Sequence, residues 1–177
     1  IMSDVIRAFE DVLGSPAESL GMRPVYDVAH NIAKWEKHYG QRLLVHRKGA
    51  TRALCAHHPA NPPVYRDIGH PALVPGSMGT ASYVLVGTEK AAETFFSVNH
   101  GAGRVLSRTA AEKKITREEF ERAMGDILYN TDNYREVVDE APLAYKDIEQ
   151  VVETLVAVGI TRKVARMRPL AVIKGKD

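Results

Sequence analysis

Five prolines between residues 59 and 75 limit what the centre of this chain can fold into more than any other feature. Proline fixes φ and lacks a backbone N–H, so a run of this kind neither continues a helix nor sits comfortably inside a sheet. We therefore expect an ordered, irregular loop here, followed by a strand over Tyr83–Val86. Regular elements have to lie on either side of this loop.

Helical periodicity is found towards the two ends of the chain. Apolar residues recur at helical spacing over residues 3–14 and again over Ile148–Val158, where Gly159 follows the last turn. Further helices are expected over Glu89–Phe95, from Arg108 onward, and after a capping box formed by Thr116 and Glu119.

Strand patterns alternate with these helices. Residues 23–38 fit either a helix or a strand, and the strand is favoured because a turn-like His38–Gln41 precedes a good strand at Arg42–His46. A last strand is expected over residues 165–174. Together the two kinds of pattern predict an α+β fold, with a mixed sheet and flanking helices.

Composition excludes several classes of protein. The 177 residues suggest one domain, or one with appendages, and the net charge of +2 argues against a globally basic nucleic-acid binder. Any phosphate-binding surface should be a local patch. Cys55 is the only cysteine, which rules out an internal disulfide. No signal peptide and no apolar run of about 20 residues is present, so we expect a cytoplasmic protein without a membrane segment.

The strongest candidate site is the stretch Asn99–Arg104, in which a histidine is followed at once by a glycine-punctuated turn and an arginine. Glycines accept positive φ, and successive N–H groups in such a turn can converge on an anion. The imidazole of His100 can act as a nucleophile, as an acid or base, or as a metal ligand. These residues alone leave open a simpler interpretation: a strand end, a turn and a surface arginine.

Two further segments suggest phosphate or nucleotide contacts. Residues 46–53 place Arg47, Lys48 and Arg52 around Gly49, which fits a phosphate contact or an ordinary solvated hairpin tip. Residues 75–82 form a loop of small and hydroxyl side chains that permits close approach of a nucleotide, but without the spacing or lysine of a P-loop.

The remaining histidines suggest less. His30 fits a hydrogen-bonded core histidine better than a metal ligand on the residues alone. Cys55, His57 and His58 have no second Cys/His pair at a matching spacing, so we reject a structural zinc site.

Four motifs occur in a fixed order: His30-Asn31, RKGATRA at 47–53, GSMGTASY at 76–83 and NHGAGR at 99–104. This set resembles the RtcB family of RNA-splicing ligases, from roughly Tyr26 to the C-terminal Lys-Gly. The resemblance implies a partial RtcB-type α+β fold. It also implies a ligase, dependent on GTP and Mn²⁺, that joins RNA 3′-phosphate or 2′,3′-cyclic phosphate ends to 5′-hydroxyl ends through a GMP–histidine intermediate.

The resemblance also assigns roles to individual residues. His100 matches the histidine that carries GMP, and His30 matches a manganese ligand, which replaces the simpler interpretation of His30. The residues that match nucleotide contacts are Ser77, Ser82, Ala102, Gly103, Tyr145 and Lys174. The residues that match phosphate or RNA contacts are Lys48, Arg104 and Arg108, and the i, i+4 spacing of the two arginines suggests one helical face.

One departure from the family is large. Family members run to several hundred residues, and their N-terminal half carries further Asp, Cys and His ligands for manganese that have no matching cluster here. Residues 1–177 therefore resemble the C-terminal portion of the catalytic domain, without the N-terminal metal-binding half. The start at Ile1-Met2 agrees with a trimmed chain.

We consequently expect little or no ligase activity from this chain alone. The expected partners are GTP, RNA ends such as cleaved tRNA halves or broken RNA, the missing half and an archease-type activator. One alternative is a non-catalytic GTP- or RNA-binding module. Another is a phosphatase-like enzyme in which His100 becomes a phosphohistidine.

Overall fold

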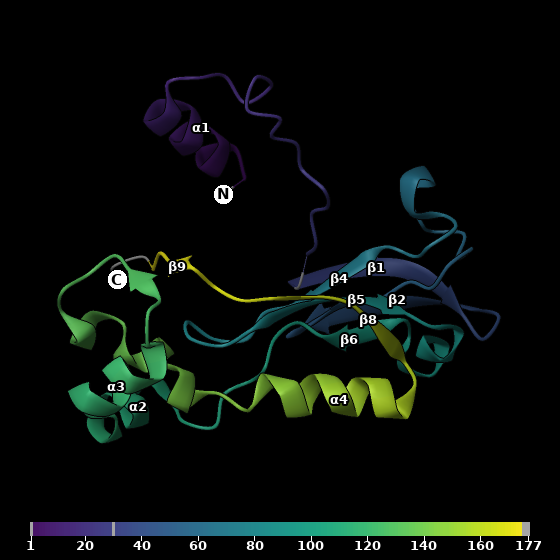
Figure 1. Ribbon diagram of the computed structural model, residues 1–177. Coiled ribbons are helices and arrows are strands. Elements are labelled where there is room, and N and C mark those ends of the chain that lie inside the picture. Colours follow the sequence, from purple (N-terminus) through teal and green to yellow (C-terminus); the bar gives the residue numbers. More distant parts are fainter. Residues whose placement is uncertain (1, 30, 175–177) are drawn as a thin grey trace.

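The computed structural model describes residues 2–29 and 31–174 (Figure 1). The helices are α1 (Met2–Leu13), α2 (Arg108–Lys114), α3 (Arg117–Met124) and α4 (Ile148–Val158). The strands are β1 (Asn31–His38), β2 (Gln41–Lys48), β3 (Ala50–Arg52), β4 (Pro71–Val74), β5 (Ser82–Gly87), β6 (Ser97–Asn99), β7 (Leu128–Tyr129), β8 (Thr161–Met167) and β9 (Ala171–Val172). Single-turn and two-turn 3₁₀ helices connect them: η1 (Pro63–Tyr65), η2 (Glu89–Thr94), η3 (Tyr134–Glu136), η4 (Val138–Glu140) and η5 (Pro142–Ala144).

The combination of helices and strands confirms the α+β prediction, but the expected mixed sheet is not found among the described residues, whose strands lie in several small sheets. β4, β5 and β8 form an antiparallel sheet in that order, and β1 with β2 forms an antiparallel hairpin. β3 pairs with β6 antiparallel, whereas β7 pairs with β9 in parallel. After β8 the chain crosses the molecule from α4 to the region of α2 and α3, so that its last described residues return beside β7 (Figure 1).

Two hydrophobic clusters form the core. The first lies between the β4–β5 strands and α4, and includes Val74, Leu85 and Val152. The second lies around α2, α3 and the 3₁₀ turns, and includes Phe120. Tyr145 packs against both clusters, so it lies where the two parts of the core meet.

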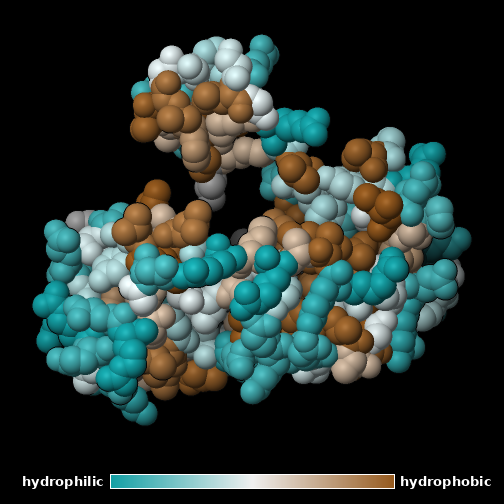
Figure 2. Space-filling view, in the orientation of Figure 1, coloured by the Kyte–Doolittle hydropathy of each residue, from teal (hydrophilic) through white to brown (hydrophobic). Residues whose placement is uncertain are grey.

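Helix α1 does not contribute to this core. It lies apart from the remaining elements (Figure 1), and none of its residues is buried. Its apolar residues, among them Val5, Phe9 and Leu13, are exposed, and hydrophobic residues gather on this helix in Figure 2. None of the described helices is long and apolar enough to span a membrane.

Local sequence signals correctly predicted several elements. The helix over residues 3–14 is α1, Ile148–Val158 is α4, and both hydrogen bonds of the Thr116–Glu119 capping box are present. Gly159 ends α4 with φ +83°, in the left-handed region that glycine adopts easily.

Other boundaries were predicted wrongly. Only Asn31–His38 of residues 23–38 is a strand, and the expected strand over 165–174 is split into β8 and β9 around Pro169. The proline-rich loop ends earlier than expected, because β4 begins at Pro71. Pro71 is the first residue of an edge strand, where its missing N–H removes no central ladder bond.

His70 gives this fold a predicted pH dependence. The ring is fully buried, stacks on Tyr26 with centroids 5.0 Å apart, and bonds through Nδ1 to the Pro71 carbonyl oxygen at 3.2 Å. Burial lowers the pKa of His70 to about 4, whereas the unfolded chain has the ordinary value near 6.5. Between these values the unfolded state binds a proton that the folded state does not, so stability falls as the pH falls.

Because of His70, we expect the free energy of unfolding to fall by about 3 kcal/mol when the pH is lowered from 7 to 4. Urea unfolding at several pH values measures this loss. His70→Phe keeps an aromatic ring against Tyr26 but does not titrate, so its stability should fall less over the same range. An equal fall in the two proteins would contradict the assignment to His70.

Candidate functional site

A pocket of about 450 Å³ lies between two loops and the returning C-terminal end. One side is the loop Pro75–Met78, and the other is the turn His100–Arg104. Glu140, Tyr145, Val172 and Lys174 complete the lining. Its size falls within the range of about 300–1,000 Å³ that is typical of small-molecule sites.

Backbone hydrogen bonds fix the turn that carries His100. β6 leads into it, and the N–H of His100 donates to the Gly49 carbonyl at 3.3 Å. The N–H of Ala102 donates to the Pro75 carbonyl at 3.1 Å, so the turn is tied to the opposite loop. These two N–H groups hold the turn in place, so they do not bind an anion themselves, and anion binding by the turn as a whole stays a prediction. Gly103 has φ +78°, which favours glycine at this position.

The serine loop is held by its own hydroxyl groups. The N–H of Ser77 donates to Thr80 Oγ1 at 2.7 Å, and the hydroxyls of the two residues lie 2.9 Å apart. Ser82 accepts from the Gly76 N–H at 3.4 Å, so it supports the loop from behind without lining the pocket. A Cβ on Gly76 would collide with the Ala81 carbonyl oxygen, which explains the need for glycine here.

A cluster of charged and hydrogen-bonding groups closes one end of the pocket. We call Arg104, Arg108, Glu140, Tyr145 and Lys174 the Glu140 cluster, because the carboxylate contacts the other four side chains. Its oxygens lie 3.3 Å from Arg104 Nη1, 3.5 Å from Arg108 Nη2 and 3.4 Å from Lys174 Nζ, and accept the Tyr145 hydroxyl at 2.5 Å. The Arg104 guanidinium also lies 4.9 Å from the centre of the Tyr145 ring.

The contacts within the Glu140 cluster shift the pKa values of Glu140 and Tyr145, which share a short hydrogen bond. Burial favours the neutral form of Glu140, but the Tyr145 hydroxyl, Lys174 and Arg104 outweigh it and lower the pKa of the carboxyl. Burial, together with the negative charge of Glu140, raises the pKa of the Tyr145 hydroxyl. At neutral pH the cluster therefore holds an ionised Glu140 against three cations, with a neutral Tyr145.

The structure brings most of the sequence-predicted site residues together. The predicted residues that line the pocket are Ser77, His100, Ala102, Gly103, Arg104, Tyr145 and Lys174. Lys48 is exposed at the end of β2, one residue before the Gly49 carbonyl that holds the His100 turn. His30 lies outside the described residues.

The expectation that Arg104 and Arg108 share a helical face is wrong. Arg104 forms an isolated bridge with Tyr145, and α2 begins only at Arg108. Ser107 caps that helix by accepting the N–H of Ala110, which separates the two arginines structurally. They still meet, because both contact Glu140.

Glu140 is the site residue that the sequence analysis missed. It lies in the polar stretch after Asn130, where an acidic side chain usually faces solvent. Its partners are 5 to 36 positions away along the chain. The only local hint is the position of the Asp139-Glu140 pair shortly before Tyr145.

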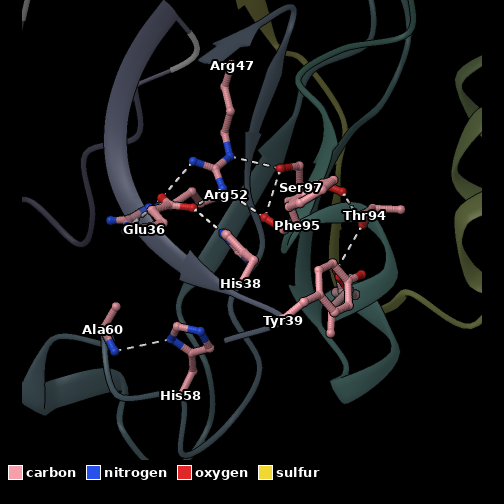
Figure 3. A network of polar contacts seen from close by, with 12 residues as sticks. Glu36, His38, Tyr39, Arg47, Arg52, His58, Ala60, Thr94, Phe95 and Ser97 are labelled. Carbon is pink, nitrogen blue, oxygen red and sulfur yellow. Dashed lines mark hydrogen bonds and ion pairs between the residues drawn. The ribbon is translucent and has the colours of Figure 1, made fainter. Parts of the chain in front are cut away.

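A second polar network corrects the interpretation of Arg47, which is neither a phosphate contact nor a solvated hairpin residue. Arg47 is 2% exposed and donates two hydrogen bonds to Glu36, at 2.8 and 2.7 Å (Figure 3). It also donates to Ser97 Oγ and to the Phe95 carbonyl, so the β1–β2 hairpin is attached to the segment that leads to His100. Burial would raise the pKa of Glu36, but the hydrogen bonds from Arg47 and His38 lower it overall.

The described residues do not by themselves form a metal centre. Within residues 2–29 and 31–174, no group of three or more His, Cys, Asp or Glu side chains is placed to hold a metal ion. Manganese normally takes several oxygen and imidazole ligands. The donor set in this part of the chain therefore does not fit manganese.

Comparison with known proteins identifies the family of the chain. A family model described as tRNA-splicing ligase RtcB matches residues 1–175. The chain is 50% identical over 179 residues to the tRNA-splicing ligase RtcB of Pyrococcus furiosus, and 49% identical over 178 residues to that of Thermococcus kodakarensis. Each match covers 97% of this chain, but only 18% and 37% of the two relatives. The chain, which thus spans well under half the length of these relatives, belongs to the RtcB family of tRNA-splicing ligases.

Proposed function

We propose that this chain supplies the nucleotide pocket and the guanylylated histidine of a GTP-dependent RNA ligase. The reaction joins an RNA 3′-phosphate or 2′,3′-cyclic phosphate end to a 5′-hydroxyl end, in tRNA splicing and RNA repair. One observation carries the proposal: a single pocket collects His100, the serine loop, Arg104, Tyr145 and Lys174 from four separate stretches of the chain. A cytoplasmic location, and help from an archease-type activator, go with this proposal.

The pocket suits transfer of a nucleotide to His100. In the proposed first step a ring nitrogen of His100 attacks the α-phosphorus of GTP. An N–P bond forms, the bond to the β-phosphate oxygen breaks, pyrophosphate leaves and the imidazole loses its N–H proton. The tethered turn holds the backbone that carries His100, and Arg104 and Arg108 of the Glu140 cluster attract the phosphates.

The later steps use the same bound guanylate. An RNA 3′-phosphate oxygen displaces His100 from phosphorus and forms an RNA–pp–G end. A 5′-hydroxyl then attacks the RNA phosphate, loses its proton and releases GMP. Tyr145 and Lys174 are proposed to hold the guanosine, and Lys48 and Arg108 to hold phosphate or RNA.

Manganese is part of the proposal only for a longer protein. The described residues do not form its site, so no step here depends on a metal that these residues hold. His30 is the residue of this chain that would contribute a ligand, together with residues that lie outside the chain. We therefore expect the isolated chain to join no RNA ends.

The test restores the missing part. The chain replaces the matching C-terminal segment of the Thermococcus kodakarensis relative, and the chimera is assayed with α-labelled GTP and Mn²⁺ and then with RNA 3′-phosphate and 5′-hydroxyl ends. We expect an acid-labile, alkali-stable label and joined RNA, both lost in His100→Ala. Label that persists in His100→Ala would contradict the proposal.

The second candidate is a GTP- or RNA-binding module without catalysis. The absence of a three-residue metal group among the described residues favours it for the isolated chain. In that case the chimera would bind GTP but take no label, whereas label from the γ-phosphate would indicate the phosphatase-like alternative.

A further inference from the structure

The β1–β2 hairpin has one face that no other described element covers. Alternation along the two strands separates the hairpin into two sides. One side carries Glu36, His38 and Arg47, which form the network that attaches the hairpin to the rest of the molecule (Figure 3). The opposite side, which we call the ribbon face, consists of Asn31, Ala33, Trp35, Lys37, Arg42, Leu44, His46 and Lys48, all of them exposed.

The composition of the ribbon face is unusual for a solvated hairpin. It has three permanent cations, Lys37, Arg42 and Lys48, and no acidic residue. Lys37 and Arg42 stand directly opposite each other in the register. Like charges in that position destabilise a strand pair, and the contact of Arg42 with the Trp35 ring leaves the repulsion between the two cations in place. A polyanionic ligand would explain their presence.

Trp35 adds a stacking surface to this charge. It is the chain's only tryptophan, and its side chain is 61% exposed at the middle of the ribbon face, opposite Leu44. The Arg42 guanidinium lies 4.7 Å from the centre of the ring. Aromatic and arginine planes within a basic strip are the usual means of binding single-stranded nucleic acid, because every base has a face that can stack.

One end of the ribbon face lies next to the turn that carries His100. Lys48 ends it, and the next residue, Gly49, accepts the His100 N–H through its carbonyl. Eight residues of strand make a surface about 25 Å long that leads towards the reactive turn. A strand of RNA lying along it would have its end near His100.

We propose that the ribbon face binds single-stranded RNA next to the reacting end, with a base stacked on Trp35 and phosphates on Lys37, Arg42 and Lys48. The inference rests on the proposed function only for the direction in which the RNA runs, with its reacting end towards His100. Its test needs neither GTP nor metal. Guanylylation of His100 is in turn measured without RNA, so the two proposals can fail separately.

The experiment titrates the 177-residue chain with a single-stranded oligouridylate of about eight nucleotides, within the usual span of such sites. Because Trp35 is the sole tryptophan, its emission reports directly on the ribbon face. We expect the oligonucleotide to quench it, and the logarithm of the affinity to fall with the logarithm of salt concentration with a slope of about −2, as three phosphate contacts require.

Variants separate stacking from charge, with binding followed by anisotropy of labelled RNA. Trp35→Ala should lose about tenfold in affinity at an unchanged salt slope, and Trp35→Phe should restore part of it. Lys37→Gln should make the slope of the salt dependence less negative by about 0.7, because one phosphate contact is lost. The matched control Lys113→Gln/Lys114→Gln removes two exposed cations from α2 and should change neither quantity.

Three results would overturn the proposal. These are no measurable RNA binding, binding that leaves the Trp35 emission unchanged, and equal losses in the ribbon and α2 variants. If this face bound a protein and not RNA, the first or the second result would follow.

Discussion

Replacing Glu140 with alanine is expected to reduce the proposed preference of the pocket for GTP over ATP by about tenfold to a hundredfold. The carboxylate holds Lys174 at 3.4 Å and the Tyr145 hydroxyl at 2.5 Å, the two residues proposed to contact guanosine. Hydrogen bonds to charged groups contribute about 1.5–3 kcal/mol each, which corresponds to that range. Arg104 keeps its bonds to the carbonyls of Leu106 and Asp139, so phosphate binding should change less.

Equilibrium competition between GTP and ATP for the purified chain measures this preference. Glu140→Gln keeps the size of the side chain and an oxygen that accepts from Tyr145 and Lys174, so it should retain more of the preference than alanine does. Glu112→Ala removes an exposed carboxylate from α2 and is the matched control. A folded Glu140→Ala protein that still distinguishes GTP from ATP as the parent does would show that Glu140 does not position the pocket.

Replacing Arg47 with methionine is expected to lower the free energy of unfolding by about 3–5 kcal/mol. This is the usual cost of removing one partner from a buried ion pair. The guanidinium is almost fully buried and provides both hydrogen bonds of the bidentate pair with Glu36. Methionine keeps much of the apolar volume, so the loss reports on the charge and its hydrogen bonds. Glu36 would be left with His38 and with Arg52 at 3.8 Å.

Urea unfolding monitored by circular dichroism gives the free energy. The double variant Glu36→Gln/Arg47→Met removes both charges and should cost less than Arg47→Met alone. Arg162→Met, which replaces an exposed arginine on β8, should change stability by less than about 0.5 kcal/mol. If the single and double variants were equally unstable, the pair with Glu36 would not be the source of the effect.

Much of the fold was predictable where the signal is local. The capping box at Thr116, the glycine that ends α4 and the apolar run of β5 depend on neighbours only a few positions away. Strand ends were less predictable, because a strand ends where its partner does. β8 ends at Met167, opposite Ser82 where its partner β5 begins, and Pro169 marks only the neighbourhood of this end in the sequence.

The sequence by itself determined the family and the position of His100, because the motifs that carry this information are short and lie in a fixed order. It also identified most of the residues that line the pocket. Only the tertiary structure decided which charges are buried. Arg47 and Lys48 are adjacent cations in one motif, yet one is enclosed by Glu36, Ser97 and Phe95 and the other is exposed.

The role of Glu140 was likewise decided by tertiary structure. Its main cationic partners, Arg104 and Lys174, lie 36 and 34 positions away. Arg104 is brought to it by the bridge with Tyr145, and Lys174 by the return of β9 beside β7. An isolated acidic side chain prefers water, and its burial is stable only when cations and hydroxyls from other parts of the chain replace that water. A sequence pattern records the charge itself, whereas the folded chain supplies the partners that give the charge its role.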